Sequence, residues 1–132
     1  MKNFIAICFL TVVFYSCDPT VSMEVNIKNR TTQDLIVEFM SFDQNLNKTL
    51  KISNNDFKLF QEGFDVGNEL IEPYLTEYDF IVIKNSSEQI LKIYKPNDDG
   101  KNIFNIDEYW LLNKPSKNFF KYEYEIHSKD LE

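Results

Sequence analysis

Cysteine and histidine are scarce in this chain of 132 residues, which has two cysteines and one histidine. Both cysteines, Cys8 and Cys17, lie near the start, so the rest of the chain has no disulfide bond to stabilise its fold. His127 has no second histidine or nearby cysteine, so zinc sites and catalysis by Cys–His or Ser–His pairs lack essential groups. We therefore expect no metal, no cofactor and no enzymatic activity, and interpret His127 as a solvated surface residue.

Glycine and alanine are also rare. The chain has three glycines, and its one alanine is Ala6. No glycine-rich loop for a phosphate or a cofactor is recognisable. Phenylalanine and tyrosine are abundant instead, with 12 and 7 residues. A chain that is poor in alanine and rich in aromatic and β-branched residues favours strands over helices.

Basic residues are outnumbered by acidic ones. The chain has 14 lysines and arginines against 21 aspartates and glutamates, which gives a formal net charge of −7. The first 16 residues contain Lys2 and no acid, so the remainder has 13 basic and 21 acidic side chains. Such a surface repels the phosphates of nucleic acids and anionic lipid headgroups, and this excludes a nucleic-acid partner.

The N-terminus has the pattern of an export signal. Lys2 precedes an uncharged stretch at residues 4–15, roughly 18 Å long as a helix and too short for a hydrocarbon core of about 30 Å. This stretch ends at Ser16-Cys17, which resembles the lipobox of bacterial lipoproteins. The resemblance implies cleavage before Cys17 and attachment of a diacylglycerol to its thiol. An ordinary signal peptide and an uncleaved anchor are the alternatives.

We accordingly divide the chain into a signal peptide at residues 1–16, a lipidated tether at 17–21 and one β-domain at 22–132. The lipoprotein resemblance implies a bacterial cell envelope location, periplasmic or at the cell surface, with membrane attachment through the lipid on Cys17. The linker is short, so the domain is expected close to its membrane.

Alternating apolar residues predict the strands. Val21, Met23, Val25 and Ile27 alternate with polar residues, and residues 35–42 form a second strand that we pair with the first as a hairpin. Further strands are expected at residues 49–53, 57–60, 79–85, 89–95, 103–112 and 119–127, with a helical turn near 105–108. About seven or eight short strands predict an all-β, antiparallel β-sandwich that would resemble an immunoglobulin-like Greek key. A small β-barrel is the alternative.

The segment at residues 61–79 has six acidic residues and no basic one. A long loop in a small β-domain is often functional, so we select it as a candidate partner-binding segment. Its candidate binding residues are Glu69, Glu72, Tyr74 and Tyr78. The alternative is a crossover between sheets whose apolar residues close one end of the sandwich.

Trp110 and the aromatic residues of 119–124 form a second candidate site, a platform on which sugar rings stack. The alternative, which we favour, places these aromatic side chains in the core. Phe120, Tyr122 and Tyr124 alternate with charged residues, so they share one face of a strand.

These patterns favour a non-catalytic, lipid-anchored envelope protein that acts as a protein-binding or scaffolding module. A carbohydrate-binding accessory lipoprotein that uses Trp110 is the main alternative. An immunity or inhibitor lipoprotein is the third.

Overall fold

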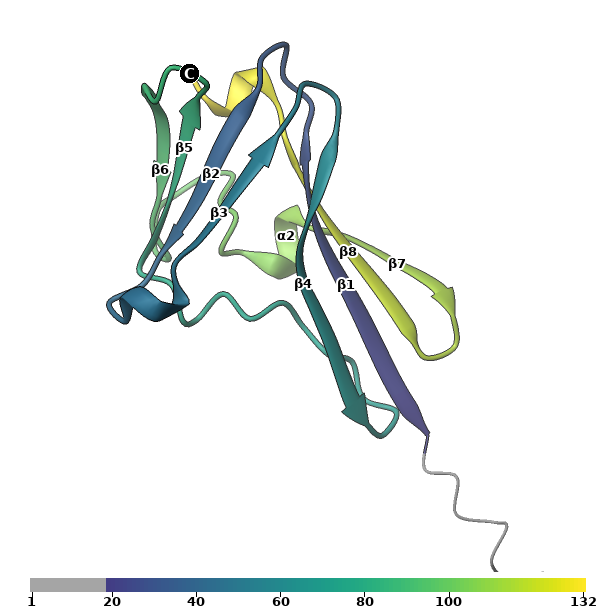
Figure 1. Ribbon diagram of the computed structural model, residues 1–132. Coiled ribbons are helices and arrows are strands. Elements are labelled where there is room, and N and C mark those ends of the chain that lie inside the picture. Colours follow the sequence, from purple (N-terminus) through teal and green to yellow (C-terminus); the bar gives the residue numbers. More distant parts are fainter. Residues whose placement is uncertain (1–18) are drawn as a thin grey trace, which may run out of the picture.

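The computed structural model describes residues 19–132, which form two four-stranded sheets packed face to face (Figure 1). Sheet 1 contains, in spatial order, β4 (Phe57–Val66), β1 (Thr20–Asn29), β8 (Phe119–Ile126) and β7 (Leu111–Ser116). Sheet 2 contains β3 (Lys48–Ile52), β2 (Leu35–Met40), β5 (Phe80–Asn85) and β6 (Ile90–Tyr94). The helices of the described residues are short: η1 (Gln44–Leu46), α2 (Ile106–Tyr109) and η2 (Ser128–Asp130). The predicted all-β sandwich is confirmed, and the sheets do not close into a barrel. The predicted signal peptide (residues 1–16) and Cys17 lie outside the described residues.

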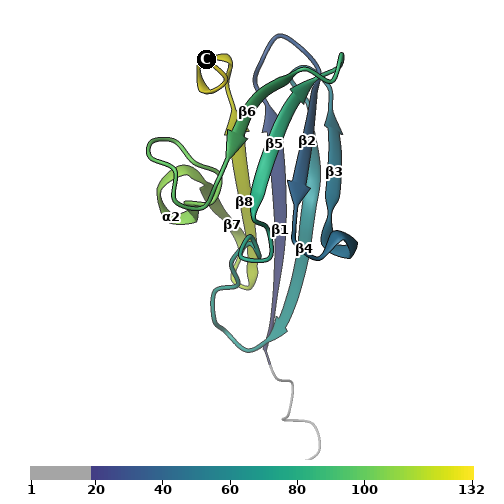
Figure 2. The same ribbon diagram turned by 90° about the vertical axis from the view of Figure 1, so that its left-hand side faces the viewer.

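The core lies between the two sheets, and Figure 2 shows sheet 2 in front of sheet 1. Alternate residues of β1 and β8 point into the core, as their sequence patterns predict. Ile27 and Tyr124 are fully buried and are neighbours in the register of the two strands. In β5 the central apolar residues Ile81, Val82 and Ile83 are all buried, which matches the prediction of a strand covered on both faces.

The strand order contains a Greek-key crossover. The hairpin β2–β3 is followed by β4 in the other sheet, and β5 then returns beside β2. All strand pairs are antiparallel except β1 and β8, which run parallel. The C-terminal hairpin β7–β8 therefore completes sheet 1 on the side of β1 opposite β4.

The predicted hairpin between the first two strands is wrong. β1 pairs with β4 and β8, and the chain crosses to sheet 2 between Asn29 and Leu35. The buried Asn29 holds this crossing together, since its Nδ2 donates hydrogen bonds to the carbonyls of Gln33 (2.7 Å) and Ile52 (3.1 Å). Alternation shows which face of a strand is buried but does not show which strand lies beside it.

Two further boundaries differ from the prediction. The fourth strand extends to Val66, so residues 61–66 belong to β4 and only residues 67–79 connect β4 to β5. The strand predicted within residues 103–112 begins only at Leu111 and runs to Ser116, as β7. α2 precedes it, which confirms the predicted helical turn near residues 105–108. Trp110 closes the compact turn by donating a hydrogen bond from Nε1 to the Ile103 carbonyl (2.7 Å). Pro115 is tolerated in β7 because this strand lies at the sheet edge.

Candidate functional site

Residues 67–79, here called the crossover segment, run from the lower end of β4 to the start of β5 and so connect the two sheets (Figure 1). Exposure alternates along its middle part, so this stretch has an inward and an outward side. Extended backbone produces such two-sided stretches because successive side chains point in opposite directions. The two sides have different chemistry, and we describe them in turn.

The inward side completes the core. Ile71, Pro73 and Leu75 are buried, which agrees with a crossover that closes one end of the sandwich. Gly63 of β4 makes room for this packing. A Cβ at Gly63 would lie 2.8 Å from the Cε of Met23 and 3.7 Å from the Cγ2 of Ile71. The missing side chain therefore allows Met23 and the segment to pack closely against β4.

Tyr78, one of the four predicted binding residues, also belongs mainly to the core. Its ring centroid lies 5.4 Å from that of Phe39 and 6.0 Å from that of Phe60. Burial and, to a smaller extent, the charge of Glu77 raise the pKa of its hydroxyl. These contacts indicate a packing role for Tyr78 and leave the other three residues as the exposed candidates.

The outward side is acidic and partly apolar. Glu69 and Glu72 are exposed, as are Leu70 (47%) and Tyr74 (55%). These side chains border a shallow hollow of about 430 Å³. The backbone N–H of Tyr74 donates a hydrogen bond to Oε1 of Gln61 (2.9 Å), which fixes the segment to β4 at this point. This bond therefore attaches the middle of the crossover segment to sheet 1.

No ion pair in the described part of the chain neutralises the carboxylates of this surface. Glu69 and Glu72 form no ion pair within residues 19–132. Burial raises the pKa of the Tyr122 hydroxyl, and the charges of Glu72 and Asp107 raise it further. Glu72 and Asp107 also line one hollow with Tyr122, so the acidic surface extends from the crossover segment to the first turn of α2. Uncompensated carboxylates create a negative potential that attracts a basic partner.

Trp110 is buried and does not present an open ring for stacking. It is 7% exposed and packs against Tyr124 with ring centroids 5.4 Å apart. Phe120, Tyr122 and Tyr124 are also buried, which confirms the favoured interpretation of these residues as core residues, whereas Phe119 is partly exposed. A sugar-binding platform built on Trp110 would need this part of the core to open.

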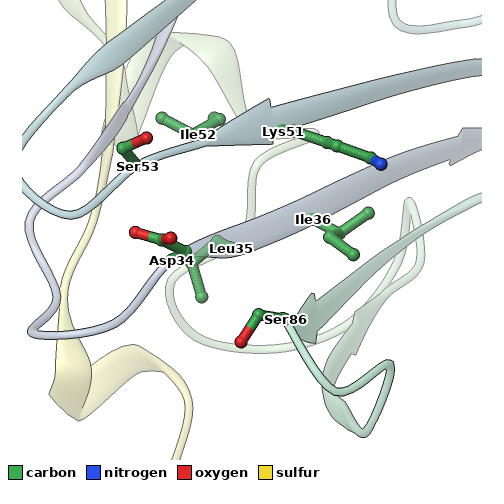
Figure 3. A pocket seen from close by; sticks show the side chains of 7 residues that line it. All are labelled: Asp34, Leu35, Ile36, Lys51, Ile52, Ser53 and Ser86. Atoms are coloured by element: carbon green, nitrogen blue, oxygen red, sulfur yellow. The ribbon is translucent and has the colours of Figure 1, made fainter.

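A hollow of about 200 Å³ lies at the ends of β2 and β3, beside the β5–β6 turn (Figure 3). Its lining residues come from three segments of sheet 2: Asp34, Leu35, Ile36, Lys51, Ile52, Ser53 and Ser86. Figure 3 shows that Lys51 extends away from Asp34 and Ser86. Asp34 already accepts a hydrogen bond from the backbone N–H of Asn54 (2.9 Å). A catalytic or binding site requires polar groups that converge on a common point, and the polar groups of this hollow do not.

His127 lies at the end of β8, with its side chain 41% exposed and Nε2 3.3 Å from Oε2 of Glu125. Within residues 19–132, no three histidine, cysteine or acidic side chains are placed to hold a metal ion. In the same part of the chain, no helix is long and apolar enough to cross a membrane.

No protein-family model matches this chain, and no curated protein is significantly similar to it.

Proposed function

We propose that this protein is a non-catalytic, lipid-anchored protein of the bacterial cell envelope that binds a protein partner through the outward side of the crossover segment. The observation that carries the proposal is the division of this segment into two sides. Ile71 and Leu75 stabilise the core, whereas Glu69, Glu72 and Tyr74 project outward without serving the fold. Exposed groups without a structural task are candidates for recognition.

The chemistry of this surface favours a basic protein as the partner. Carboxylates accelerate association with a positively charged surface, and their effect weakens as salt screens the charges. Tyrosine supplies a large contact area with few rotatable bonds and is common among the residues that dominate binding energy. Tyr74 is 55% exposed and stands among these carboxylates, so it is the candidate anchor.

The anchor in this proposal is Cys17, which lies three residues before Thr20, the first residue of β1. Attached acyl chains contribute about 0.8 kcal/mol for each buried methylene, and two chains hold a protein stably on a membrane. The partner is therefore sought in the envelope. An immunity or inhibitor lipoprotein is one form of this function, in which the partner is a toxin or an enzyme.

The first test uses cross-linking in cells, followed by purification of the partner and binding measurements at low and high salt. Replacing Glu69 and Glu72 with Gln is expected to slow association mainly at low salt, because the carboxylates act at long range. Tyr74→Ala is expected to speed dissociation at both salt concentrations.

The matched control is Asp99→Asn with Glu132→Gln, which removes two exposed charges elsewhere. It should leave the salt dependence nearly unchanged. The proposal is wrong if the control and the Glu69/Glu72 variant have the same effect. It is also wrong if Tyr74→Ala changes binding only in proportion to a loss of stability. Binding of glycans that depends on Trp110 would support the carbohydrate alternative instead.

A further inference from the structure

An exposed apolar patch lies at the end of sheet 1 where β1 begins. We call this end the tip: the start of β1, the end of β4 and the β7–β8 turn, which lie together at the lower end of Figure 1. Phe64 is 70% exposed and Val66 is 60% exposed, both on β4. Phe119, at the start of β8, is partly exposed. Neither Phe64 nor Val66 contributes to the core, and together they form an exposed apolar patch at one end of the sheet.

The register places these apolar residues directly beside the first residues of β1. Thr20 pairs with Val66, and Ser22 pairs with Phe64 on one side and with Phe119 on the other. Directly paired residues point to the same face of a sheet, so Phe64, Val66 and Phe119 share the outer face of sheet 1. Asp65 alternates with them and lies opposite the buried Val21.

Backbone hydrogen bonds fix the tip as one unit. The N–H of Ser22 donates to the carbonyl of Asn118 (2.9 Å), which attaches the β7–β8 turn to β1. The N–H of Gly67 donates to the carbonyl of Pro19 (2.7 Å), which attaches the end of β4 to the residue before β1. The position of Thr20 therefore determines the positions of Phe64 and Val66.

We infer that the tip lies against the bilayer, with Phe64 and Val66 in the lipid headgroup region; this inference rests on the proposed lipid at Cys17. Thr20 is the third residue after Cys17, so their Cα atoms are at most about 11 Å apart when this stretch is fully extended. The headgroup region on each side of a bilayer is roughly 5–7 Å thick, and interfacial apolar groups insert about 5–10 Å. A lipid on Cys17 thus holds the apolar residues of the tip within reach of the interface.

Charges of both signs lie near the tip. Lys114 of β7 and Lys117 in the β7–β8 turn are exposed, and so are Glu62 and Asp65 near the end of β4. The Nζ of Lys114 lies 5.0 Å from the centre of the Phe120 ring. Lysine side chains near a membrane bind lipid phosphates while their apolar stems remain buried. Two apolar side chains alone bind a bilayer weakly. However, the anchor makes their insertion an intramolecular step, which needs little further free energy.

Membrane contact at the tip sets the orientation of the whole domain. The C-terminal end lies at the opposite end of the molecule and would point away from the bilayer (Figure 1). The crossover segment starts at the tip, because Gly67 bonds to Pro19, so Glu69 and Glu72 would lie near the membrane surface. A partner that contacts these carboxylates is then a protein that itself lies at the membrane.

The test uses the full chain, purified with its lipid and reconstituted into phosphatidylcholine vesicles. The only thiol expected after processing is blocked by the lipid, so an introduced cysteine can be labelled selectively with a fluorophore. Val66→Cys places the label in the tip and leaves Phe64 intact. Ile90→Cys is the matched control, since Ile90 is 55% exposed at the start of β6, far from the tip (Figure 1).

The tip label is expected to lose emission when the vesicles contain brominated lipids and to be protected from iodide in the water. The Ile90 label should respond in the opposite way. Adding Phe64→Ser to the Val66→Cys variant should reduce quenching by brominated lipids. Mass spectrometry of the same sample verifies the lipid on Cys17.

Three results would overturn the inference. With the lipid present, a tip label that iodide quenches as strongly as the Ile90 label shows that the tip faces water, and the anchor proposal stands. A tip label protected from iodide but not quenched by brominated lipids shows that a second copy of the chain covers it. Absence of the lipid on Cys17 refutes both the anchor and the membrane contact.

Discussion

At the scale of single residues, the buried asparagines of β1 show how a polar side chain determines the path of the chain. Asn29 is fully buried, and its Oδ1 accepts hydrogen bonds from the backbone N–H (2.9 Å) and the hydroxyl (2.7 Å) of Thr31. Together with the bonds from its Nδ2, these contacts connect β1, the turn after it and the end of β3. Asn26 is 2% exposed, and no described residue accepts a hydrogen bond from its Nδ2.

This contrast predicts unequal costs for the same substitution. Asn29→Ala removes the buried hydrogen bonds to the Ile52 carbonyl and the Thr31 N–H, and should lower the free energy of unfolding by about 1–3 kcal/mol for each group left unsatisfied. Asn26→Ala removes a donor that already lacks a partner and should cost less. Chemical denaturation followed by circular dichroism measures both values. Equal losses would contradict the role assigned to Asn29.

At the scale of elements, the sequence predicted burial better than pairing. The alternation in β1 and β8 correctly identified their inward faces, because one side of each strand meets the core and the other meets water. The partners of β1 could not be found in this way. Both a hairpin and a crossing between sheets connect two alternating strands through a short polar link, and here Asn29 determines the outcome.

The end of β4 was not predicted, for a related reason. Its inward positions are occupied by Gln61, Gly63 and Asp65, which lie opposite the buried residues of β1. Its outward positions hold Phe64 and Val66, which are exposed. The polarity pattern is therefore inverted relative to a normal half-buried strand, and the segment resembles a loop in sequence.

The sequence pattern selected residues 61–79 as one candidate segment and did not separate the two sides of the crossover segment. Leu75 is 3% exposed and Tyr74 is 55% exposed, so these neighbours should differ sharply in stability tests. Leu75→Ala is expected to lower the free energy of unfolding by about 2–5 kcal/mol because it leaves a cavity. Tyr74→Ala should change it by no more than roughly 0.5 kcal/mol. Similar losses measured by urea denaturation would contradict the division into a core side and a binding side.

At the scale of the whole molecule, the distribution of charge agrees with attachment by lipid. A chain with a formal charge of −7 is repelled by anionic lipids and does not bind a membrane through its overall field. Acyl chains on Cys17 would overcome this repulsion, and the apolar tip would then orient the domain. In this proposal, the lipid on Cys17 anchors the protein, Phe64 in the tip orients the domain, and Glu69 in the adjoining crossover segment binds the partner.

The anchor and the orientation of the domain both depend on a lipid attached to Cys17. Mass spectrometry of the protein purified from bacterial membranes tests this attachment most directly. The wild-type chain should begin at Cys17 and carry two or three acyl chains, as the lipoprotein resemblance implies. Cys17→Ala should retain residues 1–16 and carry no lipid, because the modified thiol is required for processing. A wild-type protein that begins at another residue, or that begins at Cys17 with an unmodified thiol, would contradict the account.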